Sequence, residues 1–197
     1  MKKLIAIAAL VASAIAGAVA IAQAPAKTVT VTDASFTCIR DMTPVRGFYV
    51  SNLLGDTEAT VKVANSATGG VYPVGSVVQL VPTEAMVKRE PGFNAATKDW
   101  EFFELKVAPG GAKINVRGTT ETVNRFKGNC FSCHVQAKAE FDLICEQTHG
   151  CAPIPITPVM AKAIQNTDPR CKPMELPPEQ QAALKQLAAF TAAAAPK

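Results

Sequence analysis

The feature that most constrains this chain is a C-x-x-C-H run formed by Cys130, Cys133 and His134. Two thiols three positions apart can add to the two vinyl groups of one porphyrin, and the imidazole that follows can then ligate its iron. The run therefore predicts one covalently attached haem c. Cys130 and Cys133 would be its tethers, and His134 would be the proximal iron ligand.

Two alternative interpretations use the same cysteines. Cys130 and Cys133 can join His149 and Cys151 around a zinc ion, or they can form a redox disulfide of the thioredoxin kind. The zinc site leaves His134 without a role, and no βαβ pattern surrounds the pair. Haem attachment is therefore the preferred prediction.

The N-terminus has the layout of a secretory signal peptide. Lys2 and Lys3 precede residues 4–22, which include no charged side chain, and small residues follow. We expect residues 1–24 to be a signal peptide, the mature chain to start between positions 21 and 27, and the protein to be periplasmic. An uncleaved membrane anchor is the alternative. Because haem is attached to this motif outside the cytoplasmic membrane, leader and motif support each other.

Residues 25–197 are enough for a single haem-binding domain, and neither an internal repeat nor a break in composition argues for two. The formal net charge of +4 includes two lysines of the leader, so nucleic acid binding is not indicated. The expected partners are a redox partner protein or a small gas ligand. A homodimer is a further option, and a membrane enters only if the leader is uncleaved.

Short strand-like runs separated by glycine and proline turns fill the first part of the mature chain. The last two flank Pro109, Gly110 and Gly111, which indicates a hairpin. With no helix expected between them, these runs predict a mainly antiparallel β-sheet. The six expected strands are residues 28–32, 47–52, 60–64, 77–81, 100–107 and 112–116.

Helical signals come later in the chain. Asn129 is a suitable N-cap for a helix over residues 130–150, which begins with the haem motif. A short helix is expected over 159–165, and Pro178 fits the first turn of another in a C-terminal helical tail, residues 174–197. The expected fold class is α+β: a mainly antiparallel sheet with a haem-bearing helix and C-terminal helices.

The four cysteines outside the motif should pair in an oxidising compartment. Cys145 and Cys151 bracket a short turn that can close locally, so we expect them to be bonded. Cys38 would then pair with Cys171. The other two connectivities stay open at this point.

Separate stretches of the chain resemble the cytochrome P-460 and cytochrome c′-beta family. The resemblance implies an antiparallel sheet curled over one face of a single haem, with helices beside it and His134 as the proximal ligand. This family includes enzymes that oxidise hydroxylamine and proteins that bind nitric oxide or carbon monoxide at an open iron, so fold alone does not choose the function. The stretches are Arg46-Gly47-Phe48-Tyr49-Val50, Thr68-Gly69-Gly70, Gly75, Asp99-Trp100-Glu101-Phe102-Phe103, Cys130-Phe131-Ser132-Cys133-His134 and Asp142.

The sixth position of the iron separates the functions that the sequence allows. A methionine there would close the iron, as in an electron carrier, and Met160 is a better candidate than Met174. His149, the other histidine of the chain, is a third candidate. An iron without a protein ligand at this position would suit a gas-binding protein or an oxidase.

An open iron would lie under an aromatic lid, for which Phe48, Phe102 and Phe103 are the candidate pocket residues. An oxidase would also need a proton acceptor nearby, and Glu101 and Glu121 are candidates for that role. Ordinary core packing for the aromatic residues and solvation for the glutamates are the alternatives.

One departure from the family bears on the chemistry. Its hydroxylamine-oxidising members carry a lysine cross-linked to the haem, from the stretch ahead of the Thr-Gly turn. Here that stretch, residues 65–67, holds no lysine, and the alternation of Lys62 with Val61 and Val63 predicts that Lys62 points to solvent. We therefore expect an exported c-type cytochrome that transfers electrons or binds a small gas such as nitric oxide. A haem oxidase acting on hydroxylamine-like nitrogen compounds is the alternative.

Overall fold

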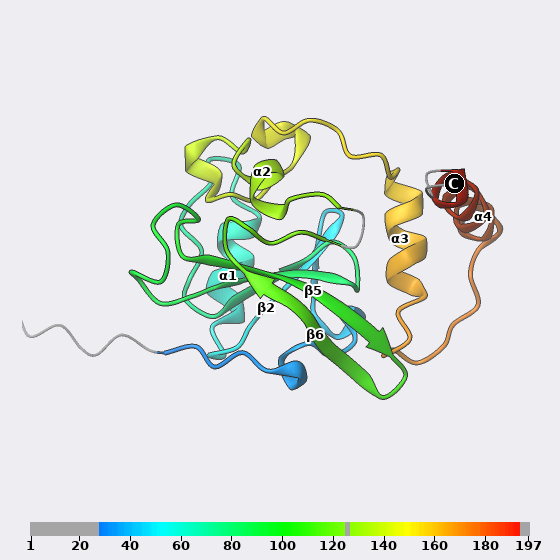
Figure 1. The fold of residues 1–197 in the computed structure, drawn as a ribbon, viewed down its shortest axis with the longest axis horizontal. Helices are drawn as coiled ribbons and strands as arrows, with labels where there is room; N and C mark the ends of the chain where they lie inside the picture. Colours follow the sequence, from blue (N-terminus) through cyan, green and yellow to red (C-terminus); the bar gives the residue numbers. More distant parts are fainter. Residues whose placement is uncertain (1–27, 125–126, 194–197) are drawn as a thin grey trace, which may run out of the picture.

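The computed structural model describes residues 28–124 and 127–193, so the expected signal peptide lies outside the described residues. A six-stranded sheet forms the centre of the fold (Figure 1). Each pair of neighbouring strands is antiparallel, and the order β1-β2-β3-β4-β5-β6 follows the chain. The predicted α+β class with a mainly antiparallel sheet is confirmed.

Four of the six strands match predicted ones, and β5 and β6 form the predicted hairpin. The sequence does not predict β1 or β4. The first contains Pro44, which an edge strand tolerates, and the second opens with Glu-Ala-Met, residues that are depleted in strands or neutral there. The strands are β1 Thr43–Val45, β2 Phe48–Asn52, β3 Ser76–Gln79, β4 Glu84–Lys88, β5 Trp100–Ala108 and β6 Gly111–Gly118.

Residues 28–32 do not form the predicted strand. Val29 and Val31 are buried and the threonines beside them are exposed, so the alternation itself is present. The backbone, however, bonds to side chains instead of a neighbouring strand. The carbonyl of Val29 accepts from Arg89 at 2.9 Å, and that of Val31 accepts from Arg117 at 3.2 Å.

The strand prediction for residues 60–64 is also wrong, because they belong to helix α1, Thr57–Ala64. The buried positions are Thr60 and Ala64, four residues apart as on one face of a helix. The Thr60 hydroxyl also accepts from Asn52 Nδ2 at 3.1 Å, which fixes α1 to strand β2. The short alternation of valines therefore indicated the two-residue period of a strand, although the segment is a helix.

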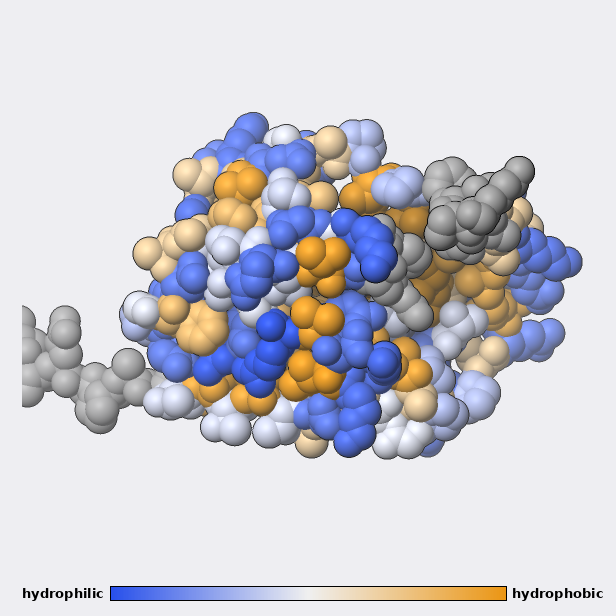
Figure 2. Space-filling view, viewed as in Figure 1, coloured by the Kyte–Doolittle hydropathy of each residue, from blue (hydrophilic) through white to orange (hydrophobic). Residues whose placement is uncertain are grey.

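The helices expected near 159–165 and from Pro178 are confirmed as α3, Pro158–Asn166, and α4, Pro178–Ala193. The two helices pack against each other (Figure 1), and Asn166 donates to the side chain of Gln180 at 2.8 Å. Figure 2 shows apolar side chains gathered over this pair of helices. Within the described residues, no helix has both the length and the apolar character needed to cross a membrane.

The helix that begins with the C-x-x-C-H motif is much shorter than predicted. Asn129 caps it as expected, with Oδ1 accepting from the Ser132 amide at 2.8 Å, but α2, Cys130–His134, ends with the motif. Asp142 and Leu143 have φ angles of 50° and 65°, a left-handed conformation that no helix continues through. The segment after α2 instead forms two single 3₁₀ turns, Ala139–Phe141 and Gln147–His149.

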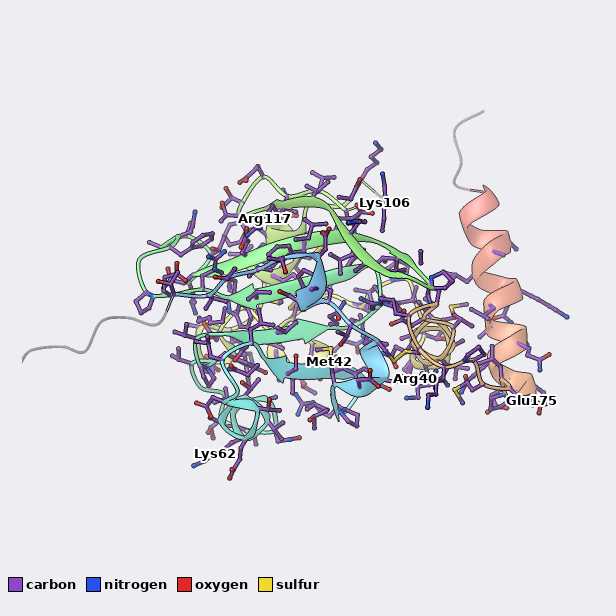
Figure 3. All side chains as sticks on the ribbon, turned by 90° about the horizontal axis from the view of Figure 1, so that it is seen from below. Arg40, Met42, Lys62, Lys106, Arg117 and Glu175 are labelled. Carbon is purple, nitrogen blue, oxygen red and sulfur yellow. A yellow bond between two sulfur atoms is a disulfide. The ribbon has the colours of Figure 1, made fainter. Side chains whose placement is uncertain are left out.

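Each face of the sheet carries its own hydrophobic cluster, because side chains alternate along a strand. The cluster nearer α2, here called the motif-side cluster, also has Cys130 and Phe131 packed against it. The opposite cluster is covered by the N-terminal segment, which crosses the strands in Figure 3. Buried members of the motif-side cluster include Phe48, Val50, Val78, Met86, Trp100, Phe102, Leu143 and Ile144, and those of the opposite cluster include Val29, Val31, Phe36, Val77, Val87, Phe103 and Leu105.

Both expected disulfides are present. Cys145 is bonded to Cys151, and Cys38 is bonded to Cys171. The second bridge joins segments 133 residues apart and so ties the start of the described chain to the segment after α3.

Candidate haem attachment site

The two motif cysteines are free thiols at the start of α2. Cys130 is half-buried against the motif-side cluster, whereas Cys133 is exposed. Burial, together with the negative charge of Glu84, raises the pKa of Cys130 to about 11. Since the other four cysteines are paired, the structure leaves two thiols three positions apart for covalent attachment.

His134 is held by a hydrogen bond from its own ring. Nδ1 lies 2.7 Å from the carbonyl oxygen of Leu143, and because a carbonyl can only accept, Nδ1 carries the proton. Burial lowers the pKa of His134 more than this bond raises it, which favours a neutral ring. Nε2 then holds the lone pair, as a metal-ligating histidine requires.

The wall facing the motif is aromatic and apolar. The rings of His134 and Phe102 are in contact, with centroids 5.2 Å apart, and Phe48 belongs to the same cluster. Phe103 lies on the other side of the sheet, against Phe36, because it is the next residue along β5. The candidate pocket therefore keeps Phe48 and Phe102 and loses Phe103.

His149 does not suit a metal ligand. Its Nδ1 lies 2.7 Å from the Ile144 carbonyl, its Nε2 lies 3.4 Å from Glu146, and its ring stacks on Phe141 with a centroid distance of 3.7 Å. The zinc site proposed as an alternative is not formed either. Cys151 is bonded to Cys145 in a disulfide and so cannot offer a thiolate to zinc.

The structure does not bring the candidate methionines to His134. Met160 lies on α3, which stands apart from α2 in Figure 1. Met174 is exposed, and its sulfur accepts from Arg40 Nη1 at 3.2 Å. Neither of these two candidate methionines is therefore placed as a sixth ligand.

The two glutamates proposed as proton acceptors do not lie beside His134. Each makes ion pairs or hydrogen bonds with other residues. Glu101 is buried on the opposite face of the sheet, between Arg89 and Arg117. Glu121 is exposed and accepts from Thr119 at 3.2 Å, and the backbone amides of this turn lower its pKa.

Sequence reasoning missed two carboxylates on the motif side. Glu84 and Glu104 are direct cross-strand partners in β4 and β5. Glu104 is buried and accepts from Asn115 at 2.5 Å, while Glu84 accepts from Asn124 at 3.1 Å. The positions of β4 and β5 could have revealed this pair, but β4 itself was not predicted.

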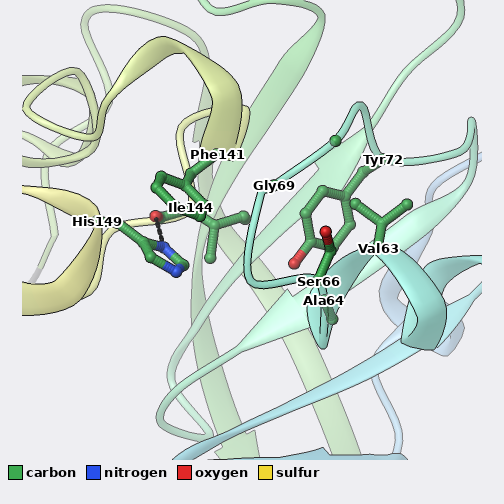
Figure 4. Close-up of a pocket in the computed structure, with 9 residues that line it drawn as sticks. Val63, Ala64, Ser66, Gly69, Tyr72, Phe141, Ile144 and His149 are labelled. Carbon is green, nitrogen blue, oxygen red and sulfur yellow. Dashed lines mark hydrogen bonds between the residues drawn. The ribbon is translucent and has the colours of Figure 1, made fainter.

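The glycine turn of residues 68–70 lies beside the segment that follows α2 (Figure 4). A Cβ on Gly69 would sit 2.1 Å from the carbonyl oxygen of Glu140, and the Gly70 amide donates to that oxygen at 2.8 Å. The cavity between this turn, Tyr72 and His149 has a volume of about 10 Å³, roughly enough for one water molecule. It is a packing defect too small for a porphyrin.

The residues present fit a haem at the motif: two free thiols, a neutral imidazole with Nε2 available, and an apolar wall with aromatic rings. Because His134 and Phe102 are in contact, a porphyrin bound by His134 would have to separate these rings.

Comparison of the chain with protein-family models, curated proteins and solved structures found no match.

Proposed function

We propose that this protein is an exported c-type cytochrome with a single haem, tethered by Cys130 and Cys133 and ligated by His134. The observation that carries the proposal is the Nδ1 hydrogen bond of His134 to Leu143, 2.7 Å long, beside two thiols that stay out of the disulfides. The bound haem would supply a redox-active iron, and the protein's residues would orient it and exclude water from one face.

The resemblance to the cytochrome P-460 and cytochrome c′-beta family gains support from where its residues meet. Trp100 donates to the carbonyl of Asp142 at 2.7 Å, and Arg46 pairs with Glu146 at 2.5 Å. These residues are far apart in the sequence but converge on the segment that follows the motif.

Within this class we favour electron transfer or binding of a small gas such as nitric oxide. Lys62 is exposed and points outward from α1 in Figure 3, although it lies on a helix and not on the predicted strand. Residues 65–67, at the end of that helix, hold no lysine. This arrangement supports the proposal of a haem without a lysine cross-link.

The alternative, a haem oxidase acting on hydroxylamine-like nitrogen compounds, is favoured by one observation. Glu84 lies close enough to Cys130 for its charge to raise the pKa of that thiol, so a carboxylate is present beside the attachment site. Hydroxylamine turnover by the purified protein, together with haem bonded to Lys62, would favour this alternative over electron transfer.

The proposal is tested by expression in a host with a haem-maturation system. We expect export, one haem per chain that resists acid-acetone extraction, and loss of one thioether in each of Cys130→Ala and Cys133→Ala. Spectra of the ferrous protein with and without carbon monoxide then separate a closed from an open iron. A colourless protein, or complete extraction of the haem, would refute covalent attachment.

A further inference from the structure

Asp142 is the centre of a buried network behind the motif. Its carboxylate accepts from Lys88 Nζ at 2.8 and 2.9 Å and from the Tyr72 amide at 2.9 Å. Its backbone carbonyl accepts from the indole Nε1 of Trp100 at 2.7 Å. Trp100, Asp142 and Lys88 are 0%, 2% and 5% exposed, so these bonds form away from water.

The network holds an unfavourable backbone. Asp142 and Leu143 are consecutive non-glycine residues in the left-handed region, with φ of 50° and 65°. This conformation is unfavourable for any residue with a Cβ, and it persists only where surrounding contacts enforce it. Both the side chain and the carbonyl of Asp142 are fixed, by Lys88 and Trp100 respectively.

This backbone conformation orients the carbonyl group of Leu143. The left-handed pair turns the chain so that the carbonyl of Leu143 faces Nδ1 of His134 at 2.7 Å. The Trp100 ring lies on the same strand face as Phe102, whose ring contacts His134. The same strand therefore positions His134 from two sides, directly through Phe102 and indirectly through Asp142.

We propose that Trp100, Asp142 and Lys88 are positioning residues that set the orientation and the donor strength of the proximal histidine. The inference rests on the proposed function, since it assigns the network a role toward the haem iron. A hydrogen bond from Nδ1 to a fixed carbonyl makes Nε2 a stronger electron donor. Loosening the network should weaken that bond and raise the reduction potential of the iron.

Two substitutions test this on the full-length protein purified as above. Trp100→Phe removes the indole donor to Asp142, and Lys88→Met removes the ammonium group. Arg89→Met is the matched control for Lys88→Met, because Arg89 is also buried and ion-paired, but on the opposite face. Tyr49→Phe is the control for Trp100→Phe, because it removes the hydroxyl that bonds Lys162 at 2.7 Å.

The measurements are the iron–histidine stretching frequency of the ferrous protein, its midpoint potential, and the solvent-exchange rate of the His134 Nδ1 proton by NMR. The two test variants should lower the frequency and speed proton exchange at least tenfold, and Trp100→Phe, which changes no charge, should also raise the potential. The control variants should leave all three unchanged. If either test variant fails to fold, Asp142→Asn replaces it, since the amide oxygen can still accept from the Tyr72 amide.

The outcomes separate this inference from the proposed function. Wild-type protein without covalent haem refutes the proposed function, and the exchange rate of the His134 proton still tests the network. Covalent haem in the wild type, with frequency, potential and exchange rate unchanged in the test variants, overturns the positioning role. Equal changes in test and control variants would mean a general loss of stability, which also overturns it.

Discussion

Lys88 and Arg89 are neighbours in the chain, yet their charges are buried on opposite faces of the sheet. Lys88 Nζ lies 2.8 Å from Asp142 on the motif side, and Arg89 pairs with Glu101 on the other. The alternation of side chains along an extended chain explains the split. The two buried ion pairs can therefore be altered independently, one beside the candidate haem site and the other on the opposite face of the sheet.

The first prediction concerns Glu101. Glu101→Gln leaves Arg89 and Arg117 without their shared carboxylate, and breaking a buried pair in this way typically costs about 3 kcal/mol or more. Urea unfolding should show that loss, while the ferrous spectrum with carbon monoxide stays unchanged. Glu121→Gln, at an exposed turn, should shift stability by less than about 0.5 kcal/mol. A changed spectrum in Glu101→Gln would contradict this and would support Glu101 as a proton acceptor after all.

The second prediction concerns the two disulfides. In the chain-entropy model, the Cys38–Cys171 bridge, with a separation of 133 residues, contributes about 5 kcal/mol. The Cys145–Cys151 bridge closes a separation of six residues and contributes about 2 kcal/mol. Double alanine variants of each pair, compared by urea unfolding, should follow this order. A larger loss for the short loop would show that it stabilises the native segment beside the motif directly.

The third prediction concerns the glycine turn. Gly69→Ala places a methyl group against the carbonyl of Glu140, at a φ of +77°, so both contact and backbone oppose it. We expect a loss of about 3 kcal/mol in unfolding free energy. Gly110→Ala is the control, because its Cβ would meet nothing within 4 Å. Equal stability of the two variants would contradict the close packing of this turn.

Local sequence signals predicted much of this fold. The Asn129 cap, the turn at Pro109 and the spacing of Cys145 and Cys151 each depend on residues close in sequence, and each gave the correct result. The strand prediction for residues 60–64 was wrong because four or five residues with two valines fit both the two-residue period of a strand and the 3.6-residue period of a helix. A longer window, including Glu58, would have favoured the helix.

The arrangement around His134 could be predicted only in part. The motif predicts His134 as an iron ligand, but the network of Lys88, Trp100 and Asp142 that we propose to orient it depends on contacts between residues 42 to 54 positions apart. The left-handed turn that ends the helix early is made by Asp142 and Leu143, and nothing in their local sequence indicates it. Tertiary hydrogen bonds to Asp142 override the helical pattern there.

The last prediction concerns the reactivity of the motif cysteines in haem-free protein exported by a host that lacks haem maturation. Burial and the charge of Glu84 raise the pKa of Cys130 from its ordinary value of 9.0 to about 11. A raised pKa disfavours the thiolate, so at neutral pH its thiolate fraction falls roughly a hundredfold. Cys133, which is exposed, should react with iodoacetamide faster than Cys130.

Mass spectrometry of the alkylated peptide, followed from pH 7 to pH 11, measures both rates. The rate at Cys130 should rise toward a midpoint near the upper end of this range. Glu84→Gln should move that midpoint to lower pH, because it removes a negative charge that disfavours the thiolate. Glu104→Gln, at the cross-strand neighbour of Glu84, is the matched control and should leave the midpoint in place. Equal rates at Cys130 and Cys133 across the range would show that Cys130 is not buried as described.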